Sequence, residues 1–156
     1  MVKVGDKLDL AFEVKAVVEG ELWSGPFSDL IRRPTVVSVY MKNNTGSCDA
    51  QTLQLRDCCR QLAARGYGLI ALSKDSVGSH RKYAAKAGLA FPLVSDPEHV
   101  FAKATDSLVE KRMYGRTFFG PTRSAYLVDP SGVVLGVVEK IDAKRHGEQL
   151  LEQIGG

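Results

Sequence analysis

Residues 35–49 read TVVSVYMKNNTGSCD and place a short apolar segment before a polar loop that ends in Cys48. Residues 35–41 are rich in β-branched and aromatic side chains and have no clear polar face. That pattern is typical of a strand buried on both faces of a sheet. From Asp49 onward, apolar residues recur every three to four positions, which predicts a helix that ends at Gly66.

Further elements are predicted on both sides of this segment. A strand or hairpin is expected at residues 4–18, a turn-rich stretch at 20–26, strands at 68–72, 91–94, 124–128 and 133–138, and helices at 77–87, from about residue 98 and around Leu150, Leu151 and Ile154. Strands alternate with helices in the first half, and a hairpin and a helix close the second. This order favours an α/β fold in which helices flank a mixed central sheet. It is compatible with a thioredoxin-like arrangement but does not single that fold out.

The composition predicts an ordinary globular protein. The chain has 156 residues, 44% of them hydrophobic and 25% charged, which fits a single domain over residues 1–156. The formal charge of +3 is spread among residues of both signs, so no nucleic-acid partner is indicated. The absence of a leader pattern and of a long apolar run predicts a cytoplasmic chain that does not span a membrane. The chain has three cysteines, and this odd number argues against a structural disulfide framework.

Cys48 is the candidate reactive residue because it lies where a buried strand ends and a helix begins. Free backbone N–H groups and the positive end of the helix dipole favour an anion at such a position, and the thiolate is the nucleophilic form of cysteine. Ligands of open α/β sheets also bind beyond the carboxyl ends of the strands. The alternative is an unreactive packing residue, since free cysteines are often buried.

The loop at residues 40–48, YMKNNTGSC, resembles the active-site loop of peroxiredoxins, in which a threonine stands three residues before the reactive cysteine. Other segments are similar to the bacterioferritin-comigratory, or Q-type, branch of that family. They are SKDSVGSH at 73–80, FPLVSD at 91–96, Glu110-Lys111, Met113-Tyr114-Gly115, Arg123-Ser124 and YLVDP at 126–130. The resemblance runs from about Gly5 to Ile154 and implies a thioredoxin-like fold with an N-terminal hairpin.

The resemblance also implies the residue roles in a thiol peroxidase that reduces hydroperoxides. Cys48 would attack the peroxide and become a sulfenic acid, and the Thr45 hydroxyl would bond both thiolate and peroxide. Arg123 would stabilise the thiolate and the developing charge. Backbone N–H groups around Gly46 and Ser47 would hold the peroxide oxygen. Judged without the resemblance, Thr45 could equally satisfy loop backbone groups, and Arg123 could be a solvated side chain.

The chain departs from the family pattern at four positions. Met41 replaces a proline that shields the thiol, which predicts a looser pocket. Gln51 replaces an acidic residue of many Q-type members, which removes one anchor for Arg123. The two positions at which relatives carry a second, resolving cysteine are occupied here by Leu53 and Ala84.

The two remaining cysteines, Cys58 and Cys59, follow Cys48 on the same predicted helix. Ten helical residues span about 15 Å, whereas a disulfide requires Cα atoms within about 7 Å. Only local unfolding of the helix would let either residue reach Cys48. We therefore expect a one-Cys cycle in which thioredoxin, glutaredoxin or a small thiol reduces the sulfenic acid.

Other functions receive less support from the sequence. His80, His99 and His146 lack metal-ligand spacing, so neither a metal nor another cofactor is expected. Residues 115–120 do not follow a predicted strand, which makes a phosphate loop there a weak prediction. The rival to a peroxidase is a low-turnover redox-sensing or partner-binding domain.

Two further expectations concern the surroundings of the site. Tyr114, Phe118 and Phe119 are predicted to form either an apolar collar near Cys48 or part of the core. The resemblance to Q-type relatives implies a monomer.

Overall fold

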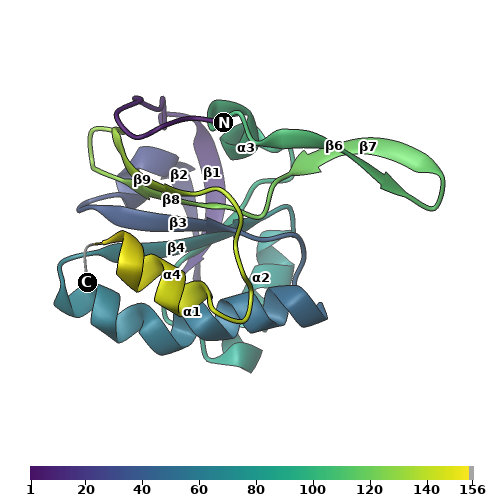
Figure 1. Ribbon diagram of the computed structural model, residues 1–156. Helices are drawn as coiled ribbons and strands as arrows, with labels where there is room; N and C mark the ends of the chain where they lie inside the picture. Colours follow the sequence, from purple (N-terminus) through teal and green to yellow (C-terminus); the bar gives the residue numbers. More distant parts are fainter. Residues whose placement is uncertain (155–156) are drawn as a thin grey trace.

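The computed structural model describes residues 1–154, and within them the central feature is a seven-stranded sheet (Figure 1). The strand order is β2-β1-β5-β4-β3-β8-β9. The bounds are β1 Glu13–Val18, β2 Glu21–Pro26, β3 Thr35–Val39, β4 Gly68–Ser73, β5 Leu93–Ser95, β8 Ala125–Val128 and β9 Val134–Val138. The β3–β4 and β4–β5 pairs are parallel and the other pairs are antiparallel. The sheet is therefore mixed, as predicted.

Helices cover both faces of this sheet. The helices α1 Gly46–Ala64, α2 Val77–Ala87 and α4 His146–Gln153 contribute side chains to one core cluster. The short helices η1 Phe27–Leu30 and α3 Val100–Ala104 contribute to the cluster on the opposite face. None of the helices within residues 1–154 is long and apolar enough to cross a membrane.

Strand β3 is apolar on both sides because both faces of the sheet are covered. Val36, and Tyr40 just after the strand, belong to the cluster under α1, whereas Val37 and Val39 belong to the cluster on the other face. Successive side chains of a strand point to opposite faces, which explains this division. All five residues of β3 are buried, in agreement with the pattern that predicted the strand.

The position of β3 brings two distant loops together. Its parallel neighbour β4 and its antiparallel neighbour β8 lie on either side of it. The end of β3 therefore lies beside the beginning of β8, where Ser38 pairs with Ala125 and the Val39 N–H donates to the Ser124 carbonyl at 2.9 Å. The loop after β3 carries Cys48, and Arg123 directly precedes this part of the chain.

Most predicted elements are confirmed, but the N-terminal part differs. The expected turn-rich stretch at 20–26 is strand β2, so the N-terminal hairpin that the resemblance implied is formed by β1 and β2 and not within residues 4–18. Strand β2 lies at the edge of the sheet with mostly exposed or half-buried side chains, so no apolar alternation marked it. Residues 4–12 form no extended strand, and only Lys7 makes a bridge, to Val133.

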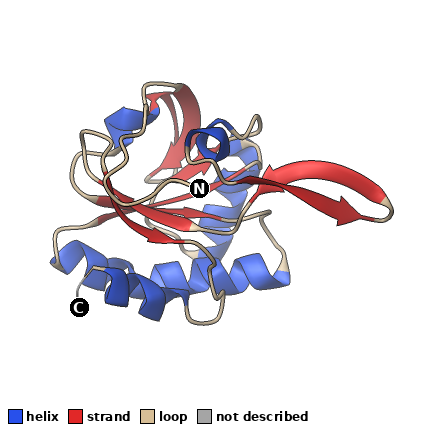
Figure 2. Ribbon diagram, turned by 45° about the horizontal axis from the view of Figure 1, so that its top comes forward, coloured by secondary structure: helices blue, strands red, loops and turns tan. Residues whose placement is uncertain are grey.

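A second hairpin was missed entirely. Strands β6 Leu108–Met113 and β7 Arg116–Pro121 pair with each other and project beyond the rest of the molecule (Figure 2). The expectation that residues 115–120 do not follow a strand is therefore wrong, because β6 ends just before Tyr114-Gly115. The hairpin packs on few neighbours, so its sequence carries little apolar periodicity from which to predict it.

Buried leucines of α1 should carry much of the stability of the fold. Leu55 is fully buried in the cluster beneath α1, whereas Leu53 on the same helix is 39% exposed. Replacing Leu55 with Ala should lower the free energy of unfolding by about 2–5 kcal/mol, because it removes buried methyl groups and leaves a cavity. The matched Leu53→Ala variant should cost less than about 1 kcal/mol. Urea denaturation measures both, and equal losses would contradict the assigned packing.

Two buried histidines should make the fold sensitive to acid. Burial lowers the pKa of His146 from 6.5 to about 4, and burial also lowers the pKa of His80. Between pH 6.5 and about pH 4, the His146 ring is protonated in the unfolded chain but neutral in the folded chain. The free energy of unfolding therefore decreases as the pH falls.

The free energy of unfolding should decrease by about 3 kcal/mol through His146 alone as the pH falls through this window. Denaturation at a series of pH values measures the slope, and His146→Gln should flatten it even if that variant is less stable at neutral pH. An unchanged slope in His146→Gln would refute the assignment.

Candidate active site

Cys48 lies in the first turn of α1, which begins at Gly46 after the N-cap residue Thr45. The first N–H groups of a helix have no carbonyl partner within it, and they carry the positive end of the helix dipole. The Cys48 side chain is only 1% exposed. The helix therefore starts three residues before the predicted position, and Cys48 lies among its first residues.

Arg123 is the side chain that contacts this sulfur. Its Nη2 atom donates to Cys48 Sγ at 3.2 Å, across 75 positions of sequence. The guanidinium therefore places a positive charge next to the sulfur. No salt bridge to Arg123 occurs within residues 1–154, so its charge is not neutralised by a carboxylate there.

A cavity of about 580 Å³ opens above Cys48. It is lined by the predicted site residues Thr45, Gly46, Ser47, Cys48 and Arg123, and also by Met41, Lys42, Lys74, His99, Lys111, Phe118, Phe119, Gly120 and Pro121. The structure thus brings together all five residues that the sequence singled out. Phe118 and Phe119 form an apolar side of the cavity, whereas Tyr114 is 97% exposed and does not line it.

Thr45 lines the cavity, but its hydroxyl makes a local contact. The Oγ1 atom donates to the Lys42 carbonyl at 2.9 Å. Within the described residues it makes no hydrogen bond to Cys48. Because its hydrogen is used in the loop, the Thr45 oxygen can offer lone pairs to a molecule in the cavity.

Asn43 fixes the loop that carries Cys48. Its backbone N–H donates to Asp75 Oδ2 at 3.0 Å, and its Nδ2 donates to Ser79 Oγ at 3.1 Å and contacts His80 Nδ1 at 3.1 Å. The Tyr40 hydroxyl donates to Asn43 Oδ1. These bonds tie the loop after β3 to α2, which limits the movement of the first turn of α1.

His80 completes this network as a neutral ring. Its Nε2 lies 3.1 Å from the Val94 carbonyl, which can only accept, so Nε2 carries the hydrogen. Its Nδ1 then accepts from Asn43 Nδ2. Burial lowers the pKa of His80, which agrees with the neutral form.

Lys111 of β6 provides a second cation near the sulfur. Its Nζ donates to the Pro121 carbonyl at 2.7 Å and to Met41 Sδ at 3.2 Å. Burial lowers the pKa of Lys111 and the neighbouring Arg123 guanidinium lowers it further, whereas Cys48 opposes this shift. Met41, which replaces the family's proline, therefore serves here as a contact for a lysine at the cavity wall.

Gln51 takes no part in holding Arg123. It is fully buried, and its Nε2 donates to Ser38 Oγ at 2.8 Å and to the Val39 carbonyl at 3.1 Å. These bonds join α1 to β3 one turn after Cys48. Gln51 therefore anchors the helix to the sheet.

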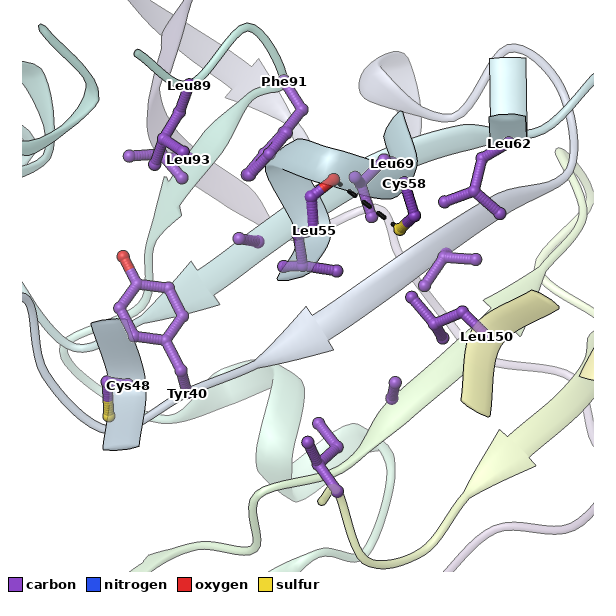
Figure 3. Close-up of a cluster of buried hydrophobic side chains, with 14 of the residues drawn as sticks. Tyr40, Cys48, Leu55, Cys58, Leu62, Leu69, Leu89, Phe91, Leu93 and Leu150 are labelled. Carbon is purple, nitrogen blue, oxygen red and sulfur yellow. Dashed lines mark hydrogen bonds between the residues drawn. The ribbon is translucent and has the colours of Figure 1, made fainter. Parts of the chain in front are cut away.

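Cys58 and Cys59 lie farther along α1 than Cys48. Figure 3 shows Cys48 beside Tyr40 at one end of the core cluster and Cys58 near Leu62 at the other. Burial raises the pKa of the Cys58 thiol to about 11, and burial also raises that of Cys59. Both thiols are therefore protonated and weakly nucleophilic at neutral pH.

The histidines do not form a metal site in the part of the chain that the structure describes. His80 and His146 are buried in different networks, and His99 lies at the cavity. No group of three or more histidine, cysteine or acidic side chains in residues 1–154 has metal-binding geometry.

Sequence reasoning missed the cationic residues around the cavity. Lys74 comes directly after β4 and Lys42 comes three residues after the end of β3, at the carboxyl ends of parallel strands, where ligands of such sheets bind. That rule gave a signal for both residues. Lys111 had no comparable signal, because the hairpin that carries it was not predicted.

The mixed sheet, its flanking helices and the cysteine at the start of α1 place this chain among the thioredoxin-fold thiol enzymes. The chain belongs to the AhpC/TSA family of peroxiredoxins, whose profile matches residues 5–137. It is 34% identical to peroxiredoxin Bcp of Xanthomonas campestris over 116 residues, which cover 74% of this chain and 72% of the relative. It is 30% identical to peroxiredoxin Bcp of Bacillus subtilis over 127 residues, which cover 81% of each.

Solved structures agree with this branch of the family. A cysteine-to-serine variant of peroxiredoxin Q from Xylella fastidiosa superposes with a TM-score of 0.86 at 28% identity, over 99% of this chain and 96% of the other. The bacterioferritin comigratory protein of X. campestris, described for its alkyl peroxide reduction, gives 0.84 at 27% identity, over 96% of each chain. The predicted resemblance to Q-type peroxiredoxins is confirmed, and the enzyme is a thiol peroxidase.

Removing the Arg123 guanidinium should slow the oxidation of Cys48. We expect Arg123→Gln to lower the second-order rate constant with hydrogen peroxide by about 100-fold, as loss of one preorganised charge-stabilising donor does in other enzymes. Competition kinetics measures this constant. Arg112→Gln, at an exposed position of β6 outside the cavity lining, is the matched control and should stay within about twofold. Equal rates for the two variants would contradict a role for Arg123.

Proposed function

We propose that this peroxiredoxin reduces hydrogen peroxide and organic hydroperoxides at Cys48 by a one-Cys cycle, and that an external thiol restores the enzyme. The observation that supports this most directly is the 3.2 Å contact between Arg123 Nη2 and Cys48 Sγ at the floor of an open cavity. Cys48 is the nucleophile, and Arg123 stabilises its thiolate. Thr45, Gly46 and Ser47 bind the peroxide.

In the oxidation step the Cys48 thiolate attacks the terminal oxygen of the hydroperoxide. The sulfur–oxygen bond forms as the oxygen–oxygen bond breaks, and the departing oxygen takes up a proton and leaves as water or an alcohol. The N–H groups at the start of α1 and the Arg123 guanidinium stabilise the developing negative charge. The Thr45 oxygen accepts the hydrogen of the peroxide, because its own hydrogen is donated to Lys42.

Organic hydroperoxides fit the same cavity. Phe118, Phe119 and Pro121 provide an apolar side for a hydrocarbon chain, and the volume of about 580 Å³ lies in the range of small-molecule sites. The bacterioferritin comigratory protein of X. campestris is described for alkyl peroxide reduction, which supports the same substrate class here.

The position and state of the other thiols support the one-Cys cycle. Cys58 is ten residues beyond Cys48 on an unbroken helix, so about 15 Å of helix axis separates them. Its Sγ donates to the Leu55 carbonyl at 3.6 Å, and burial raises its pKa to about 11. A protonated thiol at that distance does not attack the Cys48 sulfenic acid. Thioredoxin, glutaredoxin or a small thiol reduces the sulfenic acid instead.

Intact mass spectrometry after about one equivalent of hydrogen peroxide tests this proposal. The reduced protein should gain one oxygen, because Cys48 becomes a sulfenic acid with no thiol in reach, and Cys48→Ser should gain none. Adding an excess of thiol should then return the original mass, and repeated additions of peroxide should be consumed.

Two results would contradict the proposal in different ways. A loss of two hydrogens, absent in Cys58→Ser or Cys59→Ser, would establish an intramolecular disulfide and a two-Cys cycle. A single stoichiometric oxidation without turnover in the presence of thioredoxin, glutaredoxin and small thiols would indicate a redox sensor.

A further inference from the structure

The charged residues that line the cavity above Cys48 all have the same sign. Lys42, Lys74, Lys111 and Arg123 line it together with His99, and no aspartate or glutamate is among the lining residues. The net charge of the whole chain is only +3. Positive charge is therefore concentrated at the one opening that leads to the reactive sulfur. A cavity lined by one sign of charge attracts ligands of the opposite sign.

The nearby carboxylates are engaged elsewhere. Asp49 follows Cys48, but its Oδ1 accepts from the Tyr83 hydroxyl at 2.6 Å. Asp75 accepts from the Asn43 N–H at 3.0 Å and from the Ser73 hydroxyl at 2.6 Å. Across residues 1–154, no salt bridge involves any of the four lining cations. Their charges are therefore left for a ligand.

The cations form two groups by depth. Arg123 and Lys111 are half-buried beside the sulfur, where Arg123 contacts Cys48 and Lys111 is bonded to Pro121 and Met41. Lys42 and Lys74 are exposed at the mouth of the cavity and make no side-chain hydrogen bond within the described residues. The inner pair is held by Cys48, Pro121 and Met41, whereas the side chains of the outer pair have no hydrogen-bond partner among the described residues.

A peroxide alone does not account for the charge of the lining. The apolar side and the volume of about 580 Å³ suit an organic hydroperoxide, but its –OOH group carries no charge at neutral pH and leaves Lys42 and Lys74 without a partner. The reductant must also reach the sulfur, and Cys48, which is 1% exposed, lines this cavity.

We propose that the reductant is a low-molecular-weight thiol that carries carboxylates, which pair with Lys42 and Lys74 while its sulfur reaches Cys48. This inference rests on the one-Cys cycle proposed above. Arg123 and Lys111 favour the thiolate of the incoming molecule, which is its nucleophilic form. Phe118 and Pro121 provide an apolar wall for its methylene groups.

The chemistry balances without another reactant. The thiolate sulfur attacks the sulfenic sulfur of Cys48, a mixed disulfide forms, and the hydroxyl leaves with a proton as water. A second thiol attacks the mixed disulfide, releases the Cys48 thiolate, and leaves as the small-molecule disulfide. Two thiols are oxidised for each sulfenic acid reduced.

The test measures the second half-reaction separately by sequential mixing. The protein is first oxidised with one equivalent of hydrogen peroxide and then mixed with glutathione or with glutathione diethyl ester, which has the same thiol but no free carboxylate. Acid quenching and intact mass follow the mixed disulfide. Glutathione should react about fivefold faster at low ionic strength, as expected for two exposed ion pairs, and high salt should remove the difference.

Lysine variants complete the test. Lys42→Gln combined with Lys74→Gln should abolish the preference for glutathione by slowing its reaction, and should not slow the reaction of the diester, which has no carboxylate for the lysines to bind. Lys82→Gln, at an exposed position of α2 outside the cavity lining, is the control and should keep the preference. Both lysines of the double variant are exposed, so loss of folding does not confuse the result.

Two outcomes would overturn the proposal. One is equal rates for glutathione and its diester in the unmodified protein. The other is a lysine variant that slows the first half-reaction with a carboxylate-bearing hydroperoxide but not the second with glutathione, since the cations would then serve the oxidant. Failure of the one-Cys cycle itself is seen earlier, as the absence of a sulfenic acid before any thiol is added.

Discussion

The contact between Arg123 and Cys48 is the interaction on which the proposed reaction of this peroxiredoxin depends. A sulfur anion that is almost wholly removed from water is costly unless a cation or several donors face it. The cation comes from a residue 75 positions away, and its Nη2 lies 3.2 Å from Sγ. The sheet makes this meeting possible, because β3 pairs with β8 and the loop at the end of one strand lies beside the start of the other.

The start of α1 is held by polar groups that take no part in the reaction. Asn43 ties the preceding loop to α2 through Ser79 and His80, and Gln51 ties the helix to β3. Buried polar networks of this kind are costly when incomplete and rigid when satisfied. Their effect is to keep backbone N–H groups and sulfur in a fixed relation, so that little reorganisation is needed when charge develops on the peroxide oxygen.

The proposed cycle connects two features of the chain. Leu53 and Ala84 stand where relatives carry a resolving cysteine, and the lining of the cavity is positively charged. A peroxiredoxin with a second thiol in reach completes its own disulfide and meets its reductant at the surface. With Cys58 protonated and far along the helix, the proposed cycle has both substrates use one opening. The aromatic side of that opening suits a hydroperoxide with a hydrocarbon chain, and its lysines suit an anionic thiol.

The sequence by itself determined the buried strand β3, the helices at 77–87 and after Cys48, the closing hairpin and the reactive loop, because local periodicity and turn residues encode such elements. The resemblance of the loop to a known family also pointed to Thr45 and Arg123. Only the tertiary structure decided that β2 is an edge strand, that β6 and β7 form a hairpin, and that Lys111, Lys42 and Lys74 share a cavity. The place of a strand in a sheet and the residues that line a cavity depend on contacts between segments far apart in the sequence. Local patterns of side chains do not encode such contacts.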